Sequence, residues 1–302
     1  MLIDTHIHLS HCLYDGQQVP CIYFENNALK IKKYASRDDL INEFRKKGGQ
    51  FCIEPGIDLD SNKKALNLCK HYYGFLYVGV GIHPTRTLKT AWQKRHDLKK
   101  MAMEKNVIAI GEIGLDYHYP RLKQHRLKQK KWMIWQLNLA TRMNYPILFH
   151  IRDADKDMIR ILRCYKKKKH LTGGIYHCFT KDIDLANIFT QEFGILLGIG
   201  ATILRDDATE LHETVRQIDL AYLVLETDGP YVKPPRSQVL SSGKQWKKGR
   251  NSILILPAII RKIASIKGMT PLEVEKVTTQ NALKLFNISP SSCHEPHSHV
   301  IK

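Results

Sequence analysis

Eight short apolar runs, separated by longer amphipathic stretches, place the strongest constraint on the fold of this 302-residue chain. Short apolar runs are typical of buried strands, and the stretches between them are long enough for helices. Eight successive strand–helix units predict an α/β fold with a closed parallel sheet, the TIM (β/α)8 barrel. The eight expected strands are Leu2–His6, Phe51–Glu54, Leu76–Val80, Val107–Gly111, Ile147–His150, Gly174–His177, Ile195–Gly198 and Leu223–Glu226.

The barrel is expected to occupy residues 1–288 as a single domain, followed by a polar and disordered tail over 289–302. Two stretches, 11–36 and 229–251, show neither the pattern of strands nor that of helices. We expect them to be irregular connections. Helices are predicted most clearly over Gln129–Met143, Ile253–Ile266 and, with Thr270 as its N-cap, Pro271–Phe286.

The amino-acid composition indicates what kind of partner the chain binds and in which cellular compartment it works. The formal net charge of +18 favours a polyanion such as nucleic acid, although a basic surface can also serve solubility. No run approaches the roughly 18 apolar residues of a membrane-spanning helix, and the N-terminus does not resemble a secretory signal. The seven cysteines are scattered without a CxxC pair, which indicates reduced thiols in the cytoplasm.

The first expected strand ends in a pair of histidines, His6 and His8. Alternate residues of a strand face the same way, so the two imidazoles are expected to converge at its carboxyl end. Such a pair is a natural metal clamp, although paired histidines also occur as hydrogen-bonded surface residues.

Other expected strands also end in metal-ligating side chains. In a barrel these ends meet on one rim, so we expect a single site there. Histidine and carboxylate ligands suit Zn, Mn or Mg, and six ligands exceed what one tetrahedral ion needs. A carboxylate between two ions about 3.5–4 Å apart would use them all. The six candidates are His6, His8, Glu112, His150, His177 and Asp228.

Each candidate also has an ordinary structural explanation. His150 or His177 alone is more often a hydrogen-bonded core histidine, and Glu112 can be a buried acid paired with an arginine. Asp228 can simply begin the turn at Gly229-Pro230. Five strand ends that carry such residues together favour the metal site.

The same segments resemble the TatD family of metal-dependent deoxyribonucleases, in the order that the family has. The resemblance extends over nearly the whole chain. The matching segments are Asp4–Leu9 (DTHIHL), Val80–Pro84 (VGIHP), Ile110–Tyr117 (IGEIGLDY), His150–Ala154 (HIRDA), His177–Phe179 (HCF), Leu225–Tyr231 (LETDGPY) and Thr278–Ala282 (TTQNA).

The resemblance implies a divalent-metal-dependent deoxyribonuclease of the cytoplasm, acting through a metal-activated water as a 3′-to-5′ exonuclease on single-stranded DNA. Two ions are implied, the first held by His6, His8 and Asp228, the second by His150 and His177, and both by Glu112. We expect a monomer without membrane contact. Catalysis is assigned to Asp228 as ligand and base, to Glu112, and to His83 beside the phosphate or leaving group.

Substrate binding is expected of His83, Arg152, Tyr231 and Arg250. Arg152 either pairs with a phosphate oxygen or forms a salt bridge to Asp153 or Asp155. Tyr231 and Trp246 are available for base stacking. Glu226 is expected to orient a histidine ligand.

The chain departs from the family pattern in two places. The segment Ser10–Ser36 is longer than usual, and Arg250-Asn251-Ser252 stands where the family has Asn-Glu-Pro. Both departures affect the substrate side of the site rather than the metal ligands.

Barrel geometry also predicts which basic residues lie near the site and which lie at the opposite end. Lys166–Lys169 should lie at the end opposite the site, whereas two groups follow strands four and eight at the catalytic rim. These groups are Arg121, Lys123, Arg126, Lys128, Lys130 and Lys131, and Lys233, Arg236, Lys244, Lys247, Lys248 and Arg250.

Two other functions stay open at this point. One is a small-molecule amide, lactone or phosphoester hydrolase on the same two-metal barrel. Many such amidohydrolases carry a bridging carboxylated lysine, where this chain has Glu112. The other is a nucleic-acid-binding protein that has lost catalysis, against which the full ligand set argues.

Overall fold

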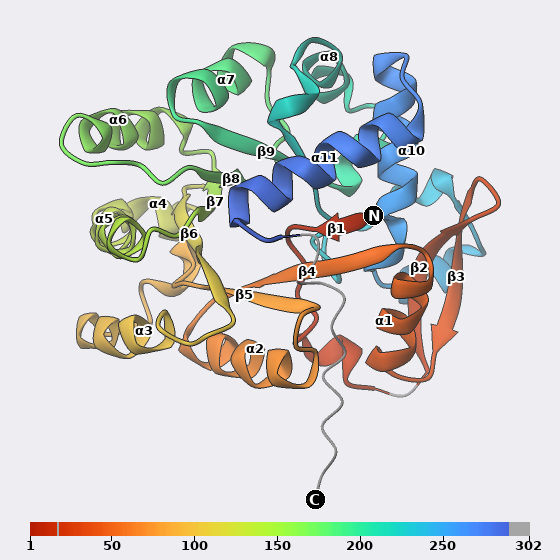
Figure 1. Cartoon of the computed structure of the whole chain (residues 1–302), viewed down its shortest axis with the longest axis horizontal. Coiled ribbons are helices and arrows are strands. Elements are labelled where there is room, and N and C mark those ends of the chain that lie inside the picture. Colours follow the sequence, from red (N-terminus) through yellow and green to blue (C-terminus); the bar gives the residue numbers. More distant parts are fainter. Residues whose placement is uncertain (17, 290–302) are drawn as a thin grey trace, which may run out of the picture.

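Eight parallel strands form the central sheet of the computed structural model, which describes residues 1–16 and 18–289. They occur in chain order across the sheet, with helices around them (Figure 1). This is the predicted TIM-barrel arrangement. The strands are β1 (Leu2–Asp4), β4 (Gly49–Pro55), β5 (Leu76–Val80), β6 (Val107–Asp116), β7 (Ile147–Arg152), β8 (Gly174–Tyr176), β9 (Ile195–Ile199) and β10 (Leu223–Leu225).

Two backbone hydrogen bonds join the carboxyl ends of the first and last strands. The amide of Thr5 donates to the carbonyl of Leu225 at 2.9 Å, and the amide of Asp228 donates to the carbonyl of His6 at 2.8 Å. The buried carboxylate of Asp4 accepts hydrogen bonds from the amide and the hydroxyl of Thr227. The segments after β1 and β10, which carry three of the six candidate ligands, are therefore held side by side.

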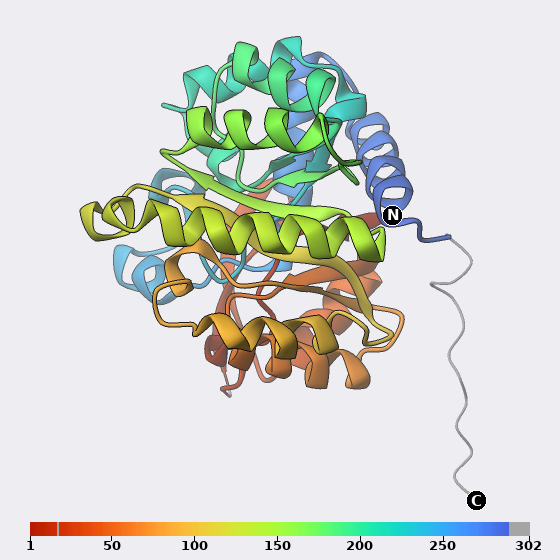
Figure 2. The ribbon, with the colours of Figure 1, turned by 90° about the vertical axis from the view of Figure 1, so that its left-hand side faces the viewer.

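Most helices pack outside the strands, as Figures 1 and 2 show from two directions. Each contributes at least one buried apolar residue, and the longer ones bury an apolar stripe. The outer helices are α1 (Arg37–Lys46), α2 (Leu59–His71), α3 (Arg95–Met101), α4 (Pro120–Gln124), α5 (Arg126–Met143), α6 (Asp155–Lys166), α7 (Ile183–Asn187), α8 (Thr209–Gln217) and α10 (Leu256–Lys267).

The last helix, α11 (Pro271–Phe286), crosses the amino end of the strands (Figure 1). Its Ala282 and Phe286 pack on a separate cluster of strand residues that includes Ile3, Phe51 and Leu148. Thr270 and Glu273 form the capping box at its start, so the predicted cap is confirmed. This end of the barrel is closed by apolar packing, which leaves the carboxyl end for chemistry.

Most predicted strand ends differ from the observed ones, and the errors at the ends of β1 and β6 change how candidate ligands are placed. β1 stops at Asp4, because Thr5 turns to pair with Leu225, so His6 and His8 follow the strand instead of alternating within it. β6 continues past Gly111 to Asp116, with an irregular register between Gly111 and Ile113. Glu112 thus lies inside β6, at that irregularity.

The two stretches expected to be irregular carry a second sheet, which corrects the prediction. Strands β2 (Val19–Glu25) and β3 (Ala28–Tyr34) form an antiparallel hairpin, and β11 (Val239–Leu240) pairs with β3 in parallel. Helix α9 (Gly243–Lys248) follows β11. The insertion after β1 and the loop after β10 therefore support each other beside α1 (Figure 1).

The three predicted helices are present, and two of them begin at other residues than predicted. α5 begins three residues before Gln129, and a 3-10 turn over Ile253–Ile255 precedes α10. No helix in the described part of the chain is both long and apolar enough to span a bilayer. The predicted tail over 289–302 lies, except for Ser289, outside the described residues.

Candidate metal centre

All six candidate ligands meet at the carboxyl end of the strands. Their side chains are largely buried, and each offers a nitrogen or oxygen to a shared space. Four sets have ligand atoms within 4.8 Å of one another, and three of them consist of predicted site residues: His6, His8 and Asp228; His6, Glu112 and His177; and His83, Glu112 and His150. The convergence expected from the rim of a barrel is therefore observed.

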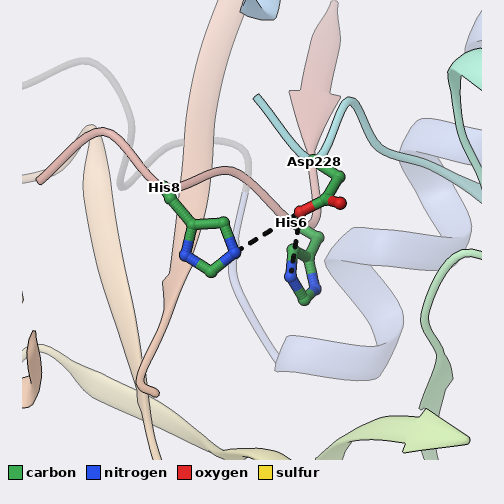
Figure 3. A group of neighbouring side chains, drawn as sticks. All are labelled: His6, His8 and Asp228. Atoms are coloured by element: carbon green, nitrogen blue, oxygen red, sulfur yellow. Dashed lines mark ion pairs between the residues drawn. The ribbon is translucent and has the colours of Figure 1, made fainter. Parts of the chain in front are cut away.

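The first set joins the segments after β1 and β10 (Figure 3). Asp228 Oδ1 lies 3.4 Å from His8 Nε2 and 3.7 Å from His6 Nε2. Asp228 has a positive φ of 54°, a conformation that aspartate tolerates and that aims its carboxylate back toward β1. The two imidazoles thus face one carboxylate oxygen.

Glu112 lies between two groups of histidines. Its Oε1 is 2.8 Å from His150 Nδ1 and 3.5 Å from His83 Nε2, whereas its Oε2 is 3.5 Å from His6 Nε2. A carboxylate whose two oxygens face different imidazoles has the geometry needed to bridge two cations.

His177 completes the centre between Asp228 and Glu226. Its ring stacks on that of His6 with centroids 3.5 Å apart, and its Nε2 is 3.9 Å from Asp228 Oδ2. On the other side, Nδ1 is 2.9 Å from Glu226 Oε1, which also accepts the amide hydrogen of Cys178. The carboxylate of Glu226 therefore lies against the ring of His177, at the ring nitrogen farther from Asp228.

The donor set fits divalent cations. Both ring nitrogens of His6 are buried without a hydrogen-bond partner, although the side chain is only 1% exposed. Although burial opposes ionisation, the surrounding histidines, among them the hydrogen-bonded His150, hold the pKa of Glu112 well below its usual range, so Glu112 is an anion. Burial and the neighbouring His177 lower the pKa of His6, which favours the neutral, ligating imidazole.

His83 differs from the other histidines in its tautomer. Its Nδ1 lies 3.2 Å from the amide of Thr85, which can only donate, and 2.7 Å from the Thr85 hydroxyl. Nδ1 must therefore accept, and a neutral His83 carries its hydrogen on Nε2, which faces Glu112. Burial and His150 lower the pKa of His83, which favours this neutral form. This nitrogen is a hydrogen-bond donor into the site.

Comparison with known proteins supports the resemblance that the sequence motifs indicated. The family described as TatD related DNase matches residues 3–287. The chain belongs to this family.

Relatives from bacteria cover nearly all of the chain. The uncharacterized metal-dependent hydrolase YabD of Bacillus subtilis is 28% identical over 96% of this chain and 100% of its own length. A Cronobacter sakazakii protein named 3′-5′ ssDNA/RNA exonuclease TatD is 30% identical over 84% of this chain and 94% of its own. The resemblance inferred from the motifs is thus confirmed.

Solved structures of TatD proteins share the fold. The Escherichia coli TatD homologue YjjV has a TM-score of 0.75 and 23% identity, over 95% of this chain and 98% of its own. A TatD-family hydrolase from Entamoeba histolytica has a TM-score of 0.74 and 23% identity, over 94% of this chain and 97% of its own.

Two buried carboxylates of this TatD-family site were not predicted. Asp116 Oδ2 lies 3.1 Å from His150 Nε2, on the edge of the ring opposite Glu112. Glu54, at the end of β4, accepts hydrogen bonds from the amide and hydroxyl of Ser10, which follows His8 closely. Both are positioned to orient ligands. The sequence feature that could have identified them is a carboxylate near the end of a strand. Asp116 is four residues after Glu112, and residues an even number apart lie on the same face of a strand.

The predicted substrate residues lie on the rim, at unequal distance from the centre. Tyr231 is 41% exposed, and its ring centroid is 5.2 Å from that of His8. Arg152 is exposed over the ring of Tyr119, and its expected alternative partners are used elsewhere: Asp153 pairs with His118, and Asp155 with Tyr176 and Lys181.

The backbone of Arg250 has a structural role that was not predicted. Its amide donates to the Pro20 carbonyl, and its carbonyl accepts from the amide of Ile22, so its backbone holds the hairpin. The next residue, Asn251, donates from its side-chain amide to the carbonyls of Thr227, Tyr231 and Val232. The altered family motif thus still anchors the loop after Asp228.

Proposed function

We propose that the protein is a divalent-metal-dependent deoxyribonuclease that removes nucleotides from the 3′ end of single-stranded DNA. The observation that carries the proposal is Glu112, whose two oxygens face histidines from opposite sides. Membership of the TatD related DNase family and the exonuclease name of the Cronobacter relative support the choice of substrate.

In this proposal the centre would hold two cations, Zn, Mg or Mn. His6, His8 and Asp228 would hold one, His150 and His177 would hold the other, and Glu112 would be shared between them. Such ions neutralise phosphate charge and lower the pKa of water at the site. His6, His8 and Asp228 have ligand atoms within 4.8 Å of one another, and Glu112 belongs both to a group with His150 and to a group with His177. These groupings and the unpartnered nitrogens of His6 support the assignment.

The protein side chains would then orient the phosphodiester and move protons. Asp228 accepts the proton that the attacking water loses, because its carboxylate is anionic: although burial opposes this, His177 and His8 lower its pKa. The neutral His83 donates a hydrogen bond from Nε2 to the phosphate or to the leaving oxygen. Arg152, Tyr231 and Arg250 bind the DNA around them.

We further propose that the enzyme acts as a monomer in the cytoplasm. Every proposed ligand comes from one chain, so a second copy is not needed to complete the centre. Cys12, Cys21, Cys52, Cys69, Cys164 and Cys178 are free thiols, which suits a reducing compartment.

The polarity of cleavage tests this proposal. We expect 5′-labelled linear single-stranded DNA to shorten stepwise from its 3′ end, and the same sequence as a closed circle to resist. Cleavage of the circle would show endonuclease action and contradict the exonuclease assignment. Turnover of bis(p-nitrophenyl) phosphate without any cleavage of DNA would indicate a small-molecule hydrolase instead.

A further inference from the structure

One exposed basic and aromatic patch adjoins the metal centre and takes no part in the fold. We call it the α4 face; it consists of Tyr119, Arg121, Lys123 and Arg152. Tyr119 is 53% exposed at the start of α4, and the Arg152 guanidinium lies 5.6 Å from the centroid of its ring. Among residues 1–16 and 18–289, neither Arg121 nor Lys123 forms a side-chain hydrogen bond or ion pair.

The α4 face is connected to a metal ligand through Asp116. Arg152 pairs with Asp116 in the β6–β7 ladder, and its carbonyl accepts from the amide of Tyr117 at 2.9 Å. The same Asp116 carboxylate contacts His150 and accepts the amide hydrogen of His118 at 3.0 Å. The segments that carry the α4 face therefore adjoin the candidate ligand His150.

Two of the positive side chains that follow β10, Lys233 and Arg236, are used inside the protein. Lys233 Nζ donates to the carbonyls of Trp246 and Lys247 and covers the Trp246 ring at 4.4 Å. The Arg236 guanidinium donates to the carbonyls of Val239 and Ser241. These side chains stabilise the loop after β10, so that basic group is less available than its sequence suggested.

The acidic neighbours of the α4 face are already paired. Asp153 lies 2.9 Å from His118 Nδ1, and Asp157 pairs with Lys130 and accepts from the hydroxyl of Tyr117. Asp157 is offset by Lys130, and Arg121, Lys123 and Arg152 outnumber Asp153, so the face keeps a net positive charge. An exposed tyrosine under a guanidinium, beside free cations, suits a nucleobase together with its phosphates.

We propose that the α4 face binds the single-stranded DNA next to the reacting phosphate, with a base stacked on Tyr119 and phosphates paired with Arg121, Lys123 and Arg152. This inference rests on the proposed nuclease function and adds the path of the strand. Stacking on an aromatic ring tolerates any base, so the face selects unpaired nucleotides over a duplex rather than a sequence.

Binding without turnover tests the proposal. The full chain with Glu112→Gln is titrated with a fluorescein-labelled dT12 in Mg²⁺, and anisotropy is read at several salt concentrations. Arg121→Gln with Lys123→Gln should reduce the slope of log K against log salt by about 1.4, about 0.7 for each phosphate contact. The matched control, Lys167→Gln with Lys168→Gln, removes two exposed lysines at the opposite end of the barrel and should not change the slope.

The stacking contact has its own test. Tyr119→Ala should weaken dT12 binding roughly 5- to 100-fold, and Tyr119→Phe should not. With an abasic oligonucleotide of the same length, the penalty of Tyr119→Ala should vanish, which a merely structural role would not produce.

The outcomes separate this inference from the nuclease proposal. If DNA binds but neither set of α4-face variants changes affinity or slope, the strand path is wrong and the nuclease can stand. If the variants weaken binding as expected while the unmutated enzyme cleaves no DNA, the binding surface stands and the nuclease proposal falls. Absence of any DNA binding overturns both.

Discussion

Asp116 Oδ2 lies 3.1 Å from Nε2 of His150, and Glu112 lies at the other ring nitrogen of that histidine. The carboxylate of Asp116 therefore fixes the ring so that Nδ1 points into the metal centre. Partners of this kind typically contribute about 10- to 100-fold to metal affinity.

The first prediction concerns this contact. Asp116→Ala should weaken Zn²⁺ or Mn²⁺ binding about 10- to 100-fold, whereas Asp116→Asn, whose amide oxygen still accepts from Nε2, should lose less. Competition with a chromogenic chelator measures both. Equal affinities for the two variants and the parent would contradict the role of Asp116.

Metal removal should lower stability. A ligand that binds only the folded chain stabilises it by about 2.7 kcal/mol at 100 times its dissociation constant. We expect metal-stripped protein to melt at a lower temperature and to recover when Mn²⁺ or Zn²⁺ is returned. Scanning fluorimetry checks this, with Glu112→Ala as the variant whose melting temperature should no longer respond to the metal.

Thr227 connects the first and last strands through Asp4. Its hydroxyl donates to Asp4 Oδ2 at 2.6 Å, and both residues are fully buried. Thr227→Val leaves that carboxyl short of one hydrogen bond, which should lower the free energy of unfolding by about 1–3 kcal/mol. Urea denaturation measures the loss. Thr227→Ser keeps the hydroxyl and should lose much less; an equal loss in both variants would refute the explanation.

Asn251 positions the loop that carries Tyr231. Because its buried side-chain amide donates to three carbonyls of that loop, Asn251→Ala should raise KM for DNA more than it lowers metal affinity. Steady-state kinetics and a metal titration on the same preparation separate the two effects. A variant whose metal affinity falls but whose KM is unchanged would place Asn251 in the metal centre instead.

The convergence of the candidate ligands could be predicted because each of them lies at or near the end of a strand. His150, His177 and Asp228 each follow an apolar run, and parallel strands bring their carboxyl ends to one rim. The exact end of a strand is not encoded in that pattern. β6 continues beyond Gly111, which is why Asp116 was not expected beside His150.

The hairpin was missed although the sequence contains a turn signal. Asn26 and Asn27 connect β2 to β3 with φ values of 50° and 62°, as the favoured two-residue hairpin turn requires. The flanking strands mix polar and apolar residues on both faces, so alternation was weak. The pairing of β11 with β3 joins residues about two hundred positions apart, and no local pattern reports such a contact.

The central claim is that this chain hydrolyses DNA with metal held around Glu112. The most direct measurement is cleavage of a 5′-labelled single-stranded oligonucleotide by metal-stripped protein, with Mg²⁺, Mn²⁺ or Zn²⁺ returned separately and Glu112→Ala in parallel. The account predicts a ladder from the 3′ end that requires metal and is absent in the variant. Confirmed metal binding without cleavage by any of the three ions, or equal cleavage by Glu112→Ala, would contradict it.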